Sequence, residues 1–341
     1  MSRERLDIWD NAKAILIILV VCGHFAEEFC DNLSSCRTAF FFIYSFHMPA
    51  FLFISGLLGK KGVDKLNKNK LIPLLYLAFI LNFMRFMSTY ITNREMNFSL
   101  LGFKNISWYL VLLVLFTLTA HVLKGFPPIY VLCMAMLIGA AAGYDKNLGS
   151  FLSLNRYFTY FPFFYMGYII DEKDIRSLTE KKWMRAAALL LIVGYLILCI
   201  RRIDDIYVLR PLFSGLNSYN KLQPPLEPFW GGAYRLIYYP LVMVIILAFI
   251  EIVPVRHIGA LSVVGKRTAS VYFWHLPLLQ LVFDFTPLKD MLNAAGERAI
   301  GYMILLAIIL AGILCLPPFT TIVNKILKPE FTGKDNRGMI N

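Results

Sequence analysis

Hydrophobic segments of about 20 residues recur along this chain, and they constrain its fold more than any other feature. Hydrophobic residues make up 58% of the sequence and charged residues 16%, whereas a soluble domain is about half apolar and a quarter charged. Because a helix needs roughly 20 apolar residues to cross a bilayer, we expect an all-α, polytopic membrane protein with about ten transmembrane helices. The expected segments are 11–29, 38–58, 71–91, 107–123, 128–143, 155–170, 184–200, 234–252, 269–285 and 300–322.

Lysine and arginine gather in alternate connections between these segments. The positive-inside rule assigns such connections to the cytoplasm, so we expect both termini to be cytoplasmic. We expect a single integral-membrane domain over residues 1–341, with a large extracytoplasmic loop at 201–233 and a cytoplasmic tail at 324–341. The loop fits an ordered lid about as well as a solvated linker. The net charge of +12 then reflects these basic connections and does not indicate nucleic-acid binding.

The first apolar segment carries ionisable residues within DNAKAILIILVVCGHFAEEF, residues 10–29. Lys13 and His24 are eleven positions apart, about three helical turns, so they share a face about 16 Å apart along the axis. Ionisable groups at membrane depth are costly and indicate function. His24 could act as a general base, or it could simply bond a neighbouring helix. Asp10 and Lys13 could form part of a site or an ordinary helix-end pair.

Two acidic residues follow His24 at helical spacing. Glu27 and Glu28 stand at i+3 and i+4, and either could orient the imidazole and stabilise its protonated form. We take Glu28 as the predicted catalytic partner of His24.

Two further histidines lie in apolar segments and precede a proline by two positions. His47, in FHMPAFLFISG, is a predicted catalytic residue or a structural hydrogen-bonding group, because the proline disturbs the helix. His275, in SVYFWHLPLL, could form a wall of a substrate site, although core packing is favoured. Trp108 and Tyr109 could stack on a sugar or belong to an interfacial aromatic belt.

Clustered cations suggest a site for an anion. The run KKGVDKLNKNK includes Lys60, Lys61 and Lys70, which suit a phosphate electrostatically but are equally typical of a cytoplasmic loop. Arg85 lies within an apolar segment and requires a partner or a polar cavity there. Among the cysteines, only Cys30 and Cys36 flank an expected extracytoplasmic loop, where a disulfide could form.

Common nucleotide and metal motifs are absent from the sequence. It has no Walker loop, no dinucleotide glycine motif, no HExxH and no nucleophile elbow. We therefore expect no metal and no ATP-driven transport. Two classes remain as alternatives to an enzyme: a transporter or flippase for a polar or glycolipid substrate, and a non-catalytic scaffold or sensor.

Several segments together resemble the acyltransferase-3 family of membrane enzymes, in particular its fucose 4-O-acetylase-like branch. DNAKAILIILVVCGHF resembles the first-helix signature, with its basic residue at Lys13 and its histidine at His24; many relatives carry arginine at the first position. FHMPAFLFISG resembles the second-helix segment, and SWYLVLLVLF, YFPFFYMGYII and SVYFWHLPLL resemble later ones more loosely.

The resemblance implies an acyltransferase in a bacterial plasma membrane. It would move an acetyl group from cytoplasmic acetyl-CoA to a hydroxyl of a cell-envelope or capsular glycan, or of its lipid-linked precursor. His24 would serve as base or as acyl carrier, with Trp108, Tyr109 and His275 near the acceptor. The expected contacts of the CoA are Asp10, Lys13, Lys60, Lys61, Lys70 and Arg85.

Overall fold

The protein is an assembly of helices, seen here in a computed structural model that describes residues 3–93, 101–103, 106–148, 151–179 and 181–328. Within these ranges, six helical stretches are long and apolar enough to cross a bilayer. They are Asp7–Glu27, Ser34–Lys65, Lys68–Ile91, Lys182–Ser214, Pro228–Ile252 and Gly296–Ile313. The predicted all-α class with membrane-type helices is therefore confirmed, whereas ten crossings and cytoplasmic termini stay predictions.

Each predicted apolar segment falls on a helix. The principal helices are α1 (Arg3–Glu27), α2 (Ser34–Lys65), α3 (Lys68–Asn93), α4 (Trp108–Leu123), α5 (Pro128–Ala142), α6 (Leu154–Ile169), α8 (Lys182–Ile206), α10 (Gly231–Ile252), α12 (Thr268–Phe285) and α14 (Ala299–Ile313). Shorter helices are α7 (Glu172–Thr179), α9 (Arg210–Ser214), α11 (Gly259–Lys266), α13 (Leu288–Ala294) and α15 (Pro317–Leu327). Four 3-10 turns are η1 (Tyr207–Leu209), η2 (Tyr219–Lys221), η3 (Pro228–Trp230) and η4 (Gly296–Arg298).

The last predicted segment differs from the structure. A single helix over 300–322 is wrong, because α14 ends at Ile313 and α15 begins at Pro317. Proline has no backbone N–H to continue a preceding helix but is well suited to a first helical position. The chain therefore turns at this point and runs on as a separate helix.

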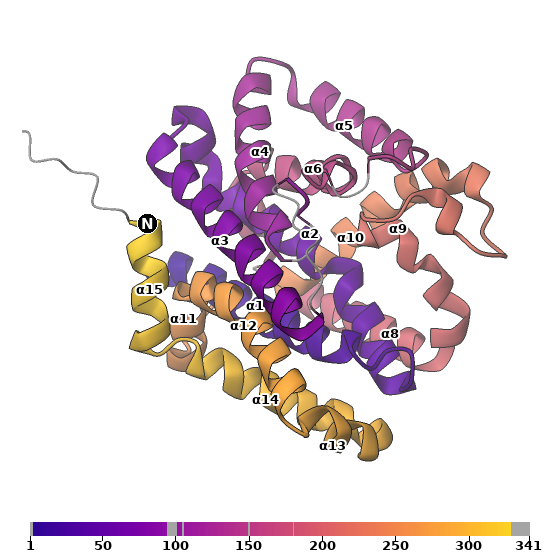
Figure 1. The fold of residues 1–341 in the computed structure, drawn as a ribbon. Helices are drawn as coiled ribbons and strands as arrows, with labels where there is room; N and C mark the ends of the chain where they lie inside the picture. The colour runs from indigo at the N-terminus through magenta and orange to yellow at the C-terminus, as the bar shows by residue number, and fades with distance from the viewer. Residues whose placement is uncertain (1–2, 94–100, 104–105, 149–150, 180, 329–341) are drawn as a thin grey trace, which may run out of the picture.

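The first two helices form the centre of the assembly (Figure 1). In the 18-residue apolar part of each helix, 72% of the α1 residues and 78% of the α2 residues are buried, compared with 11% of the residues in the stretch that contains α8. An apolar helix that is exposed in this way must face lipid in a membrane protein. Functional side chains on α1 and α2 are thus enclosed by protein, and α8 forms part of the outer wall.

A close crossing of α2 and α6 fixes the position of the second histidine-bearing helix. A Cβ atom added at Gly56 would lie 2.0 Å from the carbonyl oxygen of Phe164, and one added at Gly167 would lie 2.0 Å from that of Phe53. Only glycine permits such a backbone approach, as at small-residue crossings in other membrane helices. The two helices are therefore locked together at this level.

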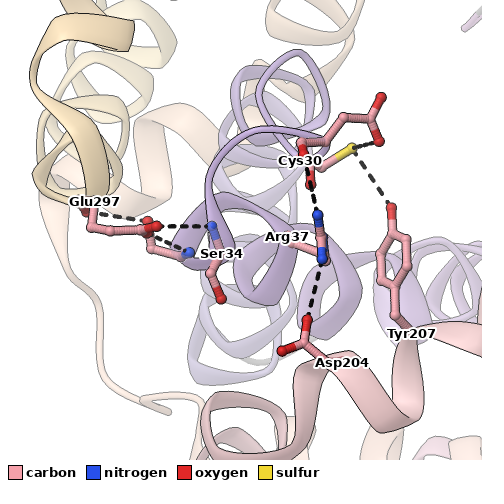
Figure 2. A network of polar contacts seen from close by, with 8 residues as sticks. Cys30, Ser34, Arg37, Asp204, Tyr207 and Glu297 are labelled. Atoms are coloured by element: carbon pink, nitrogen blue, oxygen red, sulfur yellow. Dashed lines mark hydrogen bonds and ion pairs between the residues drawn. The ribbon is translucent and has the colours of Figure 1, made fainter.

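A polar network stabilises the end of the assembly where α1 ends and α2 begins (Figure 2). The Glu297 carboxylate accepts hydrogen bonds from the backbone N–H groups of Ser34 (3.0 Å) and Ser35 (2.7 Å), at the N-terminus of α2. Arg37 donates to the carbonyl of Cys30 (2.9 Å) and pairs with Asp204 (3.2 Å). A carboxylate at a helix N-terminus satisfies otherwise free N–H groups and complements the helix dipole. The network thus joins α2 to η4, the turn that precedes α14, and to the end of α8.

The interval predicted as a large loop is ordered. Helix α8 kinks at Arg202, where φ is −131°, and continues to Ile206. The turns η1, η2 and η3 and helix α9 follow before α10 begins. At the other end, residues 324–327 of the predicted tail belong to α15, and residues 329–341 lie outside the described residues.

Candidate active site

A polar cavity of about 230 Å³ lies beside α1 and α2, at the end of the assembly that carries the network of Figure 2. It brings together side chains from α1, α2, α4, α6, α9 and α12. Its histidine, acidic, basic and aromatic lining residues are His24, His47, Glu27, Arg156, Arg210, Phe40, Tyr44, Trp108, Tyr160, Phe213 and Tyr272. We call this space the polar cavity.

His24 is oriented by a carboxylate and a phenol. Its Nδ1 lies 3.2 Å from Glu27 Oε2 and 3.2 Å from the Tyr44 hydroxyl, which itself donates to Glu27 Oε2 at 2.8 Å. With a hydrogen on Nδ1, the ring donates to the carboxylate and keeps the lone pair of Nε2 for a substrate. This arrangement of acid and imidazole is the one that general bases use in hydrolases and transferases.

Two other imidazoles stand next to His24, each anchored to its own helix. His47 donates from Nδ1 to the carbonyl of residue 43 (2.7 Å), and His275 contacts the carbonyls of residues 271 and 272 at 3.0 and 2.9 Å. The His275 ring lies 5.3 Å from that of His24, and its Nε2 is buried without a hydrogen-bond partner. Since Nδ1 is the donor in both, each ring presents Nε2 as an acceptor.

Two arginines give the polar cavity a positive wall. The Arg156 guanidinium lies 4.7 Å from the Trp108 ring centroid, and that of Arg210 lies 4.7 Å from the Phe40 centroid. Arg210 also donates to the Tyr207 hydroxyl (3.0 Å). Cations held over aromatic faces are well placed to stabilise negative charge developing on a reacting group.

An apolar cavity of about 150 Å³ adjoins the polar one. The two share Val20, Met48 and Tyr272 as lining residues. From this common wall the apolar cavity extends to Ile17, one helical turn beyond Lys13, and to Leu327 of α15. The two cavities thus follow one another along α1, from Ile17 near Lys13 to His24, and we call this succession the path. We call these ends the Lys13 end and the His24 end.

The structure distinguishes between the two glutamates. Glu27 contacts His24, whereas Glu28, the predicted partner, forms an ion pair with Lys289 on the exposed side of α1. Glu28 therefore does not touch the imidazole, and the choice of Glu28 is corrected to Glu27. The i+3 residue is favoured because the Tyr44 hydroxyl holds its carboxylate against the ring.

The predicted CoA contacts do not converge on one point. Lys13 pairs with Asp10 at 2.8 Å. Lys60 pairs with Asp171 at 2.7 Å, which lowers the pKa of that carboxyl group, while Lys61 and Lys70 are exposed.

Arg85 stands apart from these lysines. It lies 17 residues beyond Lys68 on α3, roughly 25 Å along the helix. It therefore lies well apart from the basic run 60–70, and its contact with CoA stays a prediction.

The aromatic pair at the start of α4 divides between the two cavities. Trp108 lines the polar cavity, and Tyr109 lines the apolar one, with its hydroxyl 3.0 Å from that of Ser55.

The disulfide considered for Cys30 and Cys36 is not formed.

Several lining residues were missed by the sequence analysis. Arg156, Arg210 and Tyr44 carry no motif of their own. The available signals were the charge of Arg156 at the start of an aromatic segment and the arginine directly before Pro211 within the expected loop.

Comparison with known proteins gives one informative match. The family model described as an acyltransferase domain, of the acyltransferase-3 family, matches residues 6–320. No match was found among curated proteins or among solved structures. Because the matched region takes in almost the whole chain, including every residue that lines the polar cavity, the protein belongs to the acyltransferase-3 family of membrane acyltransferases.

Proposed function

We propose that this protein is an O-acetyltransferase of the fucose 4-O-acetylase-like branch. It takes acetyl groups from cytoplasmic acetyl-CoA and transfers them to a hydroxyl of a cell-envelope or capsular glycan, or of the lipid-linked precursor of that glycan. The Lys13 end faces the cytoplasm, the His24 end faces outward, and the protein is a multi-pass component of a bacterial plasma membrane.

The observation that carries this proposal is the path formed by the two cavities. The His24–Glu27–Tyr44 group lies in the polar cavity, and the apolar cavity leads from it toward the Lys13 end. An apolar passage suits the acetyl thioester and the uncharged arm of the donor, whereas its phosphates would remain near Lys13. A cavity with a base and cations suits a sugar hydroxyl.

The chemistry follows from this placement. In direct transfer, the acceptor oxygen attacks the thioester carbonyl while His24 Nε2 takes the hydroxyl proton. The resulting oxyanion lies near Arg156 in the positive wall of the polar cavity. Collapse of this intermediate breaks the carbon–sulfur bond, and the imidazolium returns its proton to the CoA thiolate. In relayed transfer, His24 instead carries the acetyl group between donor and acceptor.

Acetyl transfer is tested with purified protein in nanodiscs, radiolabelled acetyl-CoA and extracted envelope glycans. We expect label in the glycan with the wild type and loss of that label in His24→Ala. The control is His257→Ala, because His257 pairs with Asp7 and does not line either cavity. Movement of an intact glycolipid without any acetylated product would instead indicate a flippase. Lack of both activities would indicate a scaffold or sensor.

A further inference from the structure

A recess larger than the two cavities opens on the side of the assembly. This lateral groove has a volume of about 590 Å³ and lies among α2, α8, α9 and α10. Among the residues that line it are Phe41, Ser45, Gly194, Leu209, Leu212 and Phe213. Neither the family match nor the path between the two cavities assigns it a role.

The lateral groove is lined mainly by apolar side chains. Its aliphatic residues come mainly from α8 and α10, and α8 is the least buried of the membrane-type stretches. Two of its hydroxyl groups already form hydrogen bonds: Tyr195 donates to Ser45 Oγ (2.8 Å), and Tyr238 donates to the Ser45 carbonyl oxygen (3.4 Å). This carbonyl lacks its usual helical donor because Pro49, four residues later, has no backbone N–H. With those groups satisfied, an alkyl or isoprenoid chain is the chemistry that fits.

The lateral groove and the polar cavity share one partition. Phe213 lines both spaces and packs edge-on against Phe41 at 5.0 Å. Leu209 and Leu212 line the groove, whereas Arg210 lines the polar cavity. The short stretch around α9 thus presents leucine side chains to the lateral groove and the Arg210 guanidinium to the polar cavity. A molecule that occupies both spaces would be apolar in the groove and would carry polar, negatively charged groups in the cavity.

We propose that the acceptor is a glycan linked through phosphate to a long-chain polyprenyl lipid, and that it enters sideways from the membrane. The polyprenyl chain occupies the lateral groove, the phosphate lies at Arg210, and the saccharide reaches His24 in the polar cavity. Arginine is suited to phosphate through paired N–H groups. This inference rests on the proposed acetyl transfer and selects the lipid-linked acceptor over a free polysaccharide.

Glycine positions provide a matched pair of variants. Gly194 lines the groove on α8, and Gly301 lies on α14, outside the groove. A Cβ atom added at either position would have no neighbour within 4 Å, and both residues are exposed. Gly194→Phe therefore places a ring in the groove without a clash in the helix packing, and Gly301→Phe places the same ring against lipid elsewhere.

The first experiment measures occupancy without relying on catalysis. Protein in nanodiscs of phosphatidylethanolamine and phosphatidylglycerol is irradiated with a diazirine-labelled polyprenyl phosphate. We expect crosslinks to α8 and α10, reduced at least about tenfold by Gly194→Phe, since displacing two methylene groups suffices for that loss. Gly301→Phe should leave the yield unchanged. The proposal would be overturned if Gly194→Phe did not reduce the crosslinks. It would also be overturned if excess phosphatidylglycerol competed as effectively as excess unlabelled polyprenyl phosphate.

The second experiment measures transfer. Saccharides released from the labelled glycan are supplied as diphosphates of either a polyprenol or methanol, with radiolabelled acetyl-CoA. We expect Gly194→Phe to lower the ratio of kcat/KM for the polyprenyl acceptor to kcat/KM for the methyl acceptor at least about tenfold. Equal wild-type kcat/KM for both acceptors would refute lipid entry while leaving acetyl transfer intact. Crosslinking as expected without transfer to any acceptor would instead refute the acetyltransferase function.

Discussion

Replacing Glu27 by glutamine tests the assignment of His24 as the base. The substitution keeps the size of the side chain but removes the negative charge that lies 3.2 Å from His24 Nδ1. In the transition state of proton transfer the imidazole becomes positive, so loss of this charge acts on that state and only weakly on the ground state. We therefore expect kcat to fall and the KM for acetyl-CoA to stay nearly unchanged.

The size of the effect follows from the geometry. Two unit charges about 4 Å apart interact by about 4 kcal/mol at an effective dielectric constant of 20 and by about 1 kcal/mol in water. The Glu27 side chain is 42% exposed, so an intermediate value of about 2–3 kcal/mol applies. At 1.36 kcal/mol per factor of ten, kcat should fall about 30- to 150-fold.

The assay is steady-state acetyl transfer in nanodiscs, with Glu28→Gln as the matched control. Glu28 pairs with Lys289 away from the imidazole, so its loss should change kcat by less than about twofold, as for a surface ion pair. Equal losses in the two variants, or a Glu27→Gln enzyme that retains wild-type kcat, would refute the role given to Glu27.

Three further substitutions probe the packing and the path. Gly56→Leu should abolish the folded state because its Cβ would meet a backbone carbonyl at 2.0 Å, whereas Gly59→Leu, with open space around it, should shift the thermal midpoint only slightly. Ala269→Phe, which fills the apolar cavity, should lower kcat/KM for acetyl-CoA more than about tenfold. The same change at the exposed Ala187 should not. Glu297→Ala should cost about 1–2 kcal/mol in unfolding free energy by removing the cap of α2, measured by denaturation in detergent.

Much of the helix pattern could be read from the sequence, because bilayer thickness imposes a length on each apolar segment. The predicted boundaries of α4 and α5 agree closely with the structure. The division between α14 and α15 was missed because composition stays apolar across it. The extent of α2 was also underestimated, because hydropathy does not register that a helix continues past its apolar part into the basic run.

The candidate site was predictable where a polar residue stood inside an apolar segment. His24 and His47 were found in this way, since such residues are costly without a purpose. The positions of Arg210 and Glu27 depended on tertiary contacts instead. Arg210 comes from the interval after α8, whose return over the polar cavity no local pattern indicates. The choice of Glu27 over Glu28 required the position of Tyr44 on the next helix.

The glycine contact between α2 and α6 has a consequence for how substrates come and go. Backbones that touch at Gly56 and Gly167 leave no compressible side chains between them, so this seam cannot slide or widen without breaking its packing. A rocking motion of two halves, on which alternating-access carriers depend, would have to strain it. The wall that bears His47 is therefore the one least able to move aside for an entering molecule.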